Sequence, residues 1–230
     1  MRRTSIGYLC AAILLGGVTL GQAVRADGLD GLYAGGNFGR AHNDYDTAFV
    51  DDQLKSEATA AGDVLKPSSS SVRRDDNTWW VDAGYMPWTY FGIDAAFIHL
   101  GELTHRLSGT LETLSANDSI IETASVTSHG PALSLVARVP LAESLDLDVR
   151  IGDYYGKTTL TTVLYLNSKS TSLVQSTSTS SLLVSVGGAY TFAGHWSIRL
   201  DYLRVNQAGD DKTVGKYNVN AASAGVAFTF

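Results

Sequence analysis

The sequence is poor in the residues that constrain or solubilise most chains of its size. Its 230 residues include one cysteine and four prolines, and charged side chains make up only 17%. A charged fraction well below the usual quarter argues against helical bundles and coiled coils. A single cysteine excludes an internal disulfide, so strand pairing and burial must hold the fold together. The net charge of −6 argues against a nucleic-acid partner.

Long hydrophobic runs are missing beyond the N-terminal segment. No stretch there reaches the roughly 18 apolar residues of a membrane-spanning helix, so we expect none in the mature chain. The N-terminal segment places Arg2 and Arg3 before an apolar run from Ile6 to Leu20, and small residues follow this run. The pattern is typical of a cleaved export signal. We therefore predict a signal peptide over residues 1–26 and a mature domain over residues 27–230.

What the sequence contains instead is alternation of apolar with small or polar residues, which is the period of a β-strand. Long connections follow the odd-numbered segments of this kind, and tight turns follow the second, fourth and sixth. Such asymmetry, with an even number of strands, is typical of outer-membrane barrels. The segments are, in order, Leu32–Ala41, Trp79–Tyr85, Phe91–Phe97, Leu133–Val139, Leu145–Gly152, Leu182–Tyr190, Trp196–Tyr202 and Ala222–Phe230.

We therefore predict an all-β fold, an eight-stranded antiparallel up-and-down transmembrane β-barrel. Aromatic side chains support this prediction, because they fall near both ends of the strands, where amphipathic rings meet the two membrane–water interfaces. A soluble barrel or sandwich is the alternative, and it leaves an apolar stripe on nearly every strand unexplained. The predicted membrane-interface aromatics are Tyr33, Trp79, Tyr85, Trp88, Phe91, Phe97, Tyr190, Trp196, Tyr202 and Phe228.

The two ends of the mature chain carry a family resemblance. The chain reads GLYAGGNFG from Gly31 to Gly39 and GVAFTF from Gly225 to Phe230. Together with the signal peptide, these stretches resemble small Gram-negative outer-membrane β-barrel proteins, with an eight-stranded, porin-like or OmpA-type barrel. The resemblance implies contact with outer-membrane lipid and lipopolysaccharide, and insertion by the barrel-assembly machinery. It also implies that Phe230 is part of the assembly signal, and we expect no periplasmic domain after it.

The polar positions of the alternating segments carry charges that a barrel turns inward. An eight-stranded barrel is just wide enough for side chains to fill its interior. Carboxylates and guanidiniums buried there need each other as partners. We predict a polar plug, and a narrow conduit for ions or small solutes is the alternative. The predicted lumen charges are Asp82, Asp94, Asp146, Asp148, Asp201, Arg138, Arg150 and Arg199.

Candidates for catalysis are few. His195 and Ser197 have the His-x-Ser spacing of the outer-membrane lipid A deacylases, but in this register they lie at a periplasmic turn, away from the outer leaflet. Gly209 occupies the position about where those enzymes carry a glutamate. The remaining histidines share no metal-ligand spacing. We therefore predict no enzyme activity, no cofactor and no metal site.

The segments between the predicted strands differ in character. Residues 41–76 predict a long acidic loop. Residues 103–127 and 158–183 instead alternate β-branched and polar residues around turn sequences, which favours continued strand pairing. We predict that these two hairpins extend beyond the membrane as a raised sheet, whose open edge accepts a partner strand. The alternative is that both segments are flexible polar loops.

These inferences favour a structural and surface-binding protein in the outer membrane of a Gram-negative bacterium. Its long extracellular loops then present a binding or adhesive surface to an extracellular protein ligand, above a plugged lumen. The alternatives are a narrow small-solute channel of porin type and, less favoured, an enzyme that modifies lipid A. Conductance, lipid A mass and the binding of loop-shortened variants separate the three.

Overall fold

A computed structural model describes residues 30–45, 64–112, 117–166 and 169–230, together with positions 52, 55, 56, 59, 60 and 62. The predicted signal peptide, residues 1–26, lies outside the described residues. Within the described part of the chain, no helix has the length and hydropathy needed to cross a membrane.

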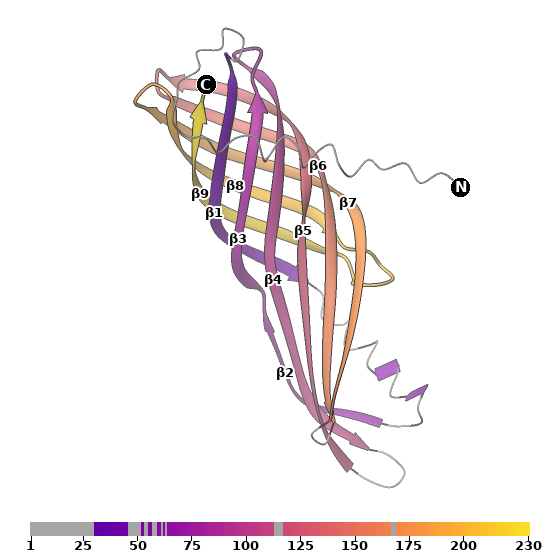
Figure 1. Ribbon diagram of the computed structural model, residues 1–230. Helices are drawn as coiled ribbons and strands as arrows, with labels where there is room; N and C mark the ends of the chain where they lie inside the picture. Colours follow the sequence, from indigo (N-terminus) through magenta and orange to yellow (C-terminus); the bar gives the residue numbers. More distant parts are fainter. Residues whose placement is uncertain are drawn as a thin grey trace, which may run out of the picture. The chain divides into compact units, whose positions relative to one another are not determined.

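Eight antiparallel strands close into a ring, which confirms the predicted barrel (Figure 1). Around the ring the order is β4-β3-β1-β9-β8-β7-β6-β5, and pairing of β5 with β4 completes it. Among the described residues, a ninth strand, β2, pairs with β4 alone. The strands are β1 (Leu32–Tyr45), β2 (Val64–Arg73), β3 (Asp75–Tyr85), β4 (Phe91–Glu112), β5 (Asn117–Ala142), β6 (Leu145–Leu166), β7 (Lys169–Phe192), β8 (Trp196–Ala208) and β9 (Tyr217–Thr229).

The first and last ring strands lie next to each other and seal the barrel. β1 pairs with β9 from Tyr33↔Thr229 to Tyr45↔Tyr217. Beyond that ladder the backbone N–H of Phe230 donates to the carbonyl of Leu32, at 2.9 Å. Closure leaves the ring without a free edge, which is what a sheet in lipid requires.

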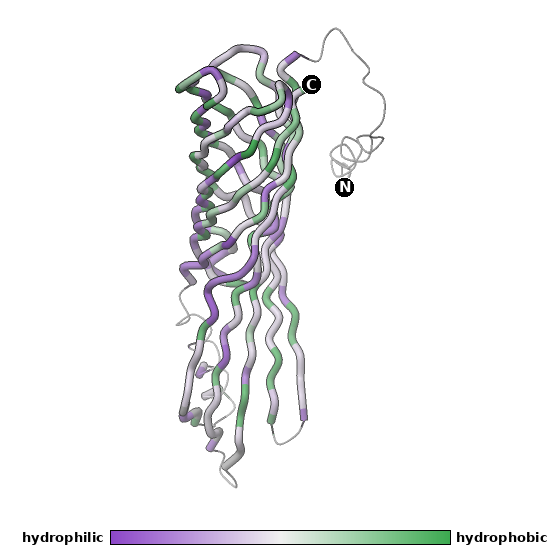
Figure 2. The backbone as a smooth tube through the Cα atoms, turned by 90° about the vertical axis from the view of Figure 1, so that its left-hand side faces the viewer, coloured by the Kyte–Doolittle hydropathy of each residue, from purple (hydrophilic) through white to green (hydrophobic). Residues whose placement is uncertain are grey.

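The period of two sorts side chains between lipid and lumen. Large apolar side chains point outward on every ring strand, and Leu135, Ile151 and Leu200 are between 53% and 64% exposed. Along the barrel strands, hydrophilic and hydrophobic residues alternate (Figure 2). Apolar exposure of this extent around a closed ring is stable in lipid and not in water.

Four strands continue far beyond the ring. β4 to β7 have 22 to 26 residues each, whereas about 10 suffice to cross a membrane. The β4–β5 and β6–β7 hairpins stay paired up to Glu112↔Asn117 and Leu166↔Lys169. The predicted extension of these hairpins is therefore confirmed. We call their distal parts (102–112, 117–129, 157–166 and 169–182), together with β2, the raised sheet.

One sequence prediction for this region was wrong. Within the predicted acidic loop 41–76, residues Val64–Arg73 form β2, which pairs with β4 from Val64↔Glu112 to Arg73↔Thr104. The reason is that β4 extends far enough to offer an unpaired edge, and an edge of this kind recruits a neighbouring extended segment. Most of residues 46–63 lies outside the described part of the chain.

Candidate functional site

The turn-side half of the lumen holds a continuous chain of alternating acidic and basic side chains. All eight predicted lumen charges lie in this half, and seven of them follow one another as ion-pair neighbours. The order is Asp146, Arg138, Asp148, Arg150, Asp201, Arg199 and Asp82. The chain therefore links β5, β6, β8 and β3 across the interior.

Three contacts in this chain have the geometry of strong, charge-assisted hydrogen bonds. Arg138 binds Asp148 with two nitrogens, at 2.7 and 2.9 Å from Nε to Oδ1 and from Nη2 to Oδ2. Arg150 Nη1 donates to Asp201 Oδ1 at 2.7 Å, and Arg199 Nη1 donates to Asp82 Oδ2 at 2.7 Å. Burying a charge costs free energy unless an opposite charge pairs with it. These contacts supply that pairing for the charged residues that alternation turns into the lumen.

Small residues make these long contacts possible. Arg150 of β6 reaches Asp201 of β8 across the intervening β7, which carries Gly187 between them. A Cβ placed on Gly187 would lie 2.2 Å from the Asp201 carboxylate, which is far inside contact distance. This role of Gly187 was not predicted from the sequence. An inward-facing glycine between two strands that carry opposite charges is the signal that identifies it.

Asp94 lies beside this chain and has a different partner. The hydroxyl of Tyr33 donates to Asp94 Oδ2 at 2.7 Å, and Tyr33 is 5% exposed. The prediction that Tyr33 lies at the membrane interface was therefore wrong. Leu32 and Ala34 flank Tyr33 and face outward, so the alternation places Tyr33 in the lumen, where its hydroxyl satisfies the buried carboxylate.

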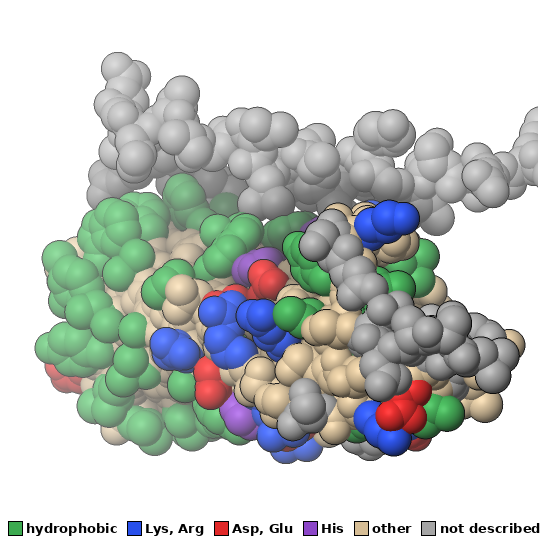
Figure 3. Space-filling model, turned by 90° about the horizontal axis from the view of Figure 1, so that it is seen from below, with side chains coloured by type: hydrophobic (Ala, Val, Ile, Leu, Met, Phe, Trp, Pro, Cys, Tyr) green, Lys and Arg blue, Asp and Glu red, His purple; other side chains and the backbone are tan. Residues whose placement is uncertain are grey.

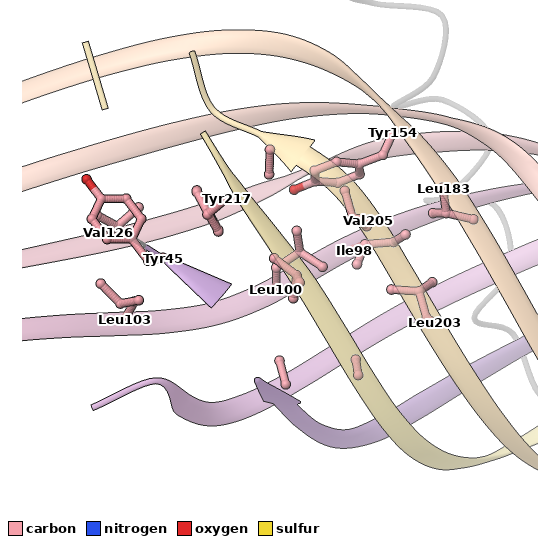
Figure 4. Packing of buried hydrophobic residues seen from close by; sticks show 14 of the residues in the cluster. Tyr45, Ile98, Leu100, Leu103, Val126, Tyr154, Leu183, Leu203, Val205 and Tyr217 are labelled. Atoms are coloured by element: carbon pink, nitrogen blue, oxygen red, sulfur yellow. The ribbon is translucent and has the colours of Figure 1, made fainter. Parts of the chain in front are cut away.

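The loop-side half of the lumen is filled by apolar side chains instead. Ile98 of β4, Leu183 of β7, and Leu203 and Val205 of β8 are at most 4% exposed (Figure 4). Tyr45, Tyr154 and Tyr217 pack in the same cluster, and the β8–β9 connection adds Val214, which is fully buried. We call this cluster the apolar plug.

Little space remains between the charged chain and the apolar plug. A cavity of about 20 Å³ lies at their boundary, lined by Asp94 and Arg150 on one side and by Ile98, Leu183 and Leu203 on the other. That volume holds about one water molecule. The charged chain and the apolar plug therefore approach each other closely at this boundary.

The other predicted interface aromatics point away from the lumen. Trp79, Tyr85, Trp88, Phe91, Tyr190, Trp196 and Tyr202 are exposed, and Phe97 and Phe228 are half-buried. Phe228 packs between Trp196 and Phe230, with ring centroids 5.1 and 5.2 Å apart. Outward-facing rings are what the predicted position at a membrane–water interface requires.

Four of the five histidines lie in three separate environments. His195 Nδ1 is 2.8 Å from the carbonyl of Thr229 and the ring stacks on Phe228, at the tight-turn end of the barrel. His99 and His129 are cross-strand neighbours on the outer face. His105 is buried in the raised sheet, with Nε2 3.0 Å from Ser70 Oγ. Among the described residues, no group of three His, Cys, Asp or Glu side chains is placed to hold a metal ion.

Charges of both signs gather at the loop end of the molecule (Figure 3). His42 Nδ1 is 2.8 Å from Asp75 Oδ1, and Lys66 Nζ is 2.7 Å from Glu112 Oε1. These pairs are exposed, so each contributes little to stability. This end therefore presents a mixed polar surface beside the raised sheet.

The two edges of the raised sheet differ. β2 carries Pro67 and a register shift between Pro67 and Ser69, and both features are natural blocks to edge pairing. On the other side, β7 pairs with β8 only from Leu183↔Val205 to Phe192↔Trp196. Residues 169–182 of β7 therefore have no strand partner on that side within the described chain. They contain no proline, and most are Ser or Thr.

Comparison with known proteins identifies a family. The model of the OmpA-like transmembrane domain matches residues 27–230. Comparison with curated proteins finds no match.

Several solved outer-membrane proteins are similar in fold. OprG from Pseudomonas aeruginosa is 13% identical, with 87% of this chain and 97% of that chain covered and a TM-score of 0.45. Ail, the attachment invasion locus protein of Yersinia pestis, is 12% identical in its complex with a heparin analogue, with coverages of 86% and 99% and a TM-score of 0.42. The outer membrane protease OmpT from Escherichia coli is 10% identical, with coverages of 88% and 98% and a TM-score of 0.47.

Proposed function

The chain belongs to the OmpA-like transmembrane domain family, and from this premise we propose that it is a non-enzymatic surface protein of the Gram-negative outer membrane. Its long loops face the exterior, and its raised sheet binds an extracellular polypeptide by accepting it as an additional strand. The observation that carries the proposal is the open edge of β7, over residues 169–182.

The backbone of this edge is available for pairing. Thr191 donates its N–H to Ser144, so odd-numbered residues of β7 face β6. The β6–β7 register continues without a shift to Leu166↔Lys169. Because backbone groups alternate in direction along a strand, even-numbered residues from Ser170 to Ser176 turn their N–H and C=O groups to the open side. Added strands bind through such groups.

The side chains of the edge favour an extended partner. Ser and Thr residues have small polar side chains that fit a pleated surface, and Leu173 and Val174 are 50% and 62% exposed. Lys169 is the one charged residue between positions 169 and 182, so repulsion is low. A partner strand with alternating apolar and polar residues therefore matches this edge.

Proline substitutions test the proposal without shortening the chain. Ser172→Pro with Ser176→Pro removes two N–H donors that point to the open side, while the β6–β7 ladder keeps its own donors. We expect extended peptides from a displayed library to bind the wild type and to lose binding, by about tenfold or more, to the proline variant.

The matched control is Ser172→Ala with Ser176→Ala, which removes the same hydroxyls but keeps both backbone donors. This variant should bind like the wild type, and bound peptide should slow hydrogen exchange at residues 172 and 176. Equal binding by the proline and alanine variants would contradict strand addition.

For the lumen we propose a structural role rather than transport. The ion-pair chain and the apolar plug support this, since together they occupy the described interior. The charged half of the lumen favours a narrow small-solute channel as a second candidate, with the apolar plug as its closed gate.

A non-enzymatic role is supported by the surroundings of the one His-x-Ser pair. The His195 ring is engaged with the Thr229 carbonyl and Phe228, and Ser197 Oγ is 3.1 Å from Thr191 Oγ1. Both residues lie at the tight-turn end, which we place in the periplasm. We further propose that the C-terminal Phe230 is read by the barrel-assembly machinery.

A further inference from the structure

Two histidines face each other on the outer side of the barrel, where the wall continues into the raised sheet. His99 of β4 and His129 of β5 form a cross-strand pair, in which His99 is half-buried and His129 is exposed. The register between the two strands shifts directly after this pair. The pair belongs to neither edge of the raised sheet, so it is separate from the strand-accepting edge of the proposed function.

The backbone pairing brings the two imidazoles as close as neighbouring strands allow. The N–H of Arg138 donates to the carbonyl of Tyr90 at 2.8 Å, which makes this a hydrogen-bonded position of the β4–β5 ladder. Hydrogen-bonded and non-hydrogen-bonded positions alternate, so His99↔His129 is a non-hydrogen-bonded pair. Pro131 stands at another position of this class, as a residue without an N–H should. Side chains approach most closely in such pairs, with Cβ atoms about 5 Å apart.

The ring nitrogens of both histidines are available to a ligand. Within the described chain, neither the His99 nor the His129 ring makes a hydrogen bond or an ion pair. The rings of His42, His105 and His195 each contact an oxygen at 2.8–3.0 Å. Two adjacent imidazoles whose nitrogens are not engaged are ligands that suit Zn²⁺ and Cu²⁺.

The surroundings of the pair favour a cation. Trp79 stacks on the His99 ring, with centroids 5.8 Å apart and planes at 25°, which limits how this ring turns. Asp76 and Glu102 are the acidic neighbours of His99. Lys157 of β6 lies opposite the second histidine and is exposed, so solvent and salt screen its charge. Two carboxylates and one screened ammonium group therefore leave the site attractive to a positive ion.

We propose that His99 and His129 form a surface site for a divalent transition-metal ion, Zn²⁺ or Cu²⁺. One nitrogen of each imidazole binds the ion, at about 2.0–2.1 Å for Zn²⁺, and water molecules complete the coordination shell. With two protein ligands, the site binds the ion reversibly and the fold does not depend on it. Mg²⁺ prefers oxygen ligands and is rejected. The histidine spacing along the sequence gave no sign of this site, because only the strand register brings the two residues together.

The test measures the Zn²⁺ affinity of the refolded, tag-free protein by competition with a chromogenic chelator, with Mg²⁺ as the negative probe. His129→Gln is expected to weaken Zn²⁺ binding by about tenfold or more, because one of two protein ligands is lost. His99→Gln should have the same effect. Binding should also weaken below about pH 6, where imidazoles gain protons.

The matched control is His42→Gln, which removes an exposed histidine whose ring lies between Asp44 and Asp75. It should bind Zn²⁺ like the wild type. Loss of affinity in this variant alone, or an equal loss in the His42 and His129 variants, would overturn the proposal. Unchanged affinity in both the His99 and the His129 variants would overturn it as well.

A gain of affinity keeps the test valid if a histidine variant fails to fold, which heat-modifiable gel mobility reveals. Thr127 faces outward two residues before His129, so Thr127→His adds a third imidazole and should tighten Zn²⁺ binding by about tenfold. Electron paramagnetic resonance of the Cu²⁺-loaded wild type should show coupling to two imidazole nitrogens, and that of His129→Gln to one. Coupling to a single nitrogen in the wild type would contradict a shared site.

Discussion

Single residues decide whether the lumen charges meet. The guanidinium of Arg150 crosses β7 to reach Asp201 because position 187 has no side chain in the way. Gly188, its neighbour, faces the lipid and leaves a Cβ nothing closer than the Asp146 carbonyl at 3.9 Å. The two adjacent glycines of β7 therefore differ in role. Gly187 leaves room for the contact between Arg150 and Asp201, whereas Gly188 plays no part in the ion-pair chain.

We predict that Gly187→Ala lowers the free energy of unfolding by about 1–3 kcal/mol, because the added methyl group displaces the Asp201 carboxylate. Gly188→Ala should change it by less than about 0.5 kcal/mol. Urea titration of the refolded barrel in lipid vesicles measures both values. Similar stabilities for the two variants would show that Arg150 and Asp201 do not need this gap.

At the scale of elements, the β8–β9 connection packs into the loop end of the barrel. Val214 is buried in the apolar plug, and its carbonyl accepts a hydrogen bond from Tyr45 at 2.7 Å. Burial opposes ionisation of Asp210, but hydrogen bonds from the backbone of Thr213 and Val214 and from Thr177 outweigh it and hold the pKa below its usual range. The loop is thus fastened by an ionised carboxylate.

The lowered pKa of Asp210 makes the stability of this loop depend on pH. A folded-state pKa below the unfolded value gives a stabilisation that is complete above the unfolded pKa and is lost as pH falls through the folded pKa. An unperturbed aspartate titrates near about pH 4, so the loop loosens only in more acidic solution.

We predict that the amide proton resonances of Thr213 and Val214 titrate together, with a midpoint below about pH 4. Nuclear magnetic resonance of the labelled protein in detergent measures this. Asp210→Asn should abolish the titration, and Asp211→Asn should leave it in place because Asp211 pairs with Lys216 instead. Retention of the transition in Asp210→Asn would contradict the assignment.

For the whole molecule, the lumen has two layers with different physical properties. The charged layer attracts water and ions, whereas the apolar plug excludes them by dewetting and by packing. The layers lie in series, so conduction needs both to open. We therefore predict that the apolar plug, rather than the ion-pair chain, limits any conductance.

We predict that the wild-type barrel is silent in planar bilayers and stays silent when Asp148 and Arg150 are neutralised. Ile98→Ala, Leu183→Ala and Leu203→Ala together should produce openings, because these side chains close the loop end. The matched control truncates three lipid-facing residues, Ile93, Leu135 and Leu200, and should remain silent. Steady wild-type openings that respond to the Asp148 and Arg150 changes would instead favour the channel.

Much of this architecture is encoded locally in the sequence. Alternation along Trp196–Tyr202 or Leu145–Gly152 fixes which residues face lipid, because successive side chains of a strand point to opposite faces. The same rule, applied to the Ser- and Thr-rich hairpins, predicts that β4 to β7 continue beyond the ring. It also assigns Tyr33 to the lumen once Leu32 and Ala34 face outward, although an interface aromatic was the stronger expectation there.

What the sequence by itself determined is the barrel, its apolar outer band and the charges that enter the lumen, since each depends on a period of two within one segment. Only the tertiary structure decided that Arg150 crosses Gly187, that Val214 packs into the loop end, that β2 joins β4, and that His99 lies opposite His129. The physical reason is that these contacts depend on the register between strands around a closed ring. Many weak pairings between strands determine the register together, so the sequence of a single segment does not specify it.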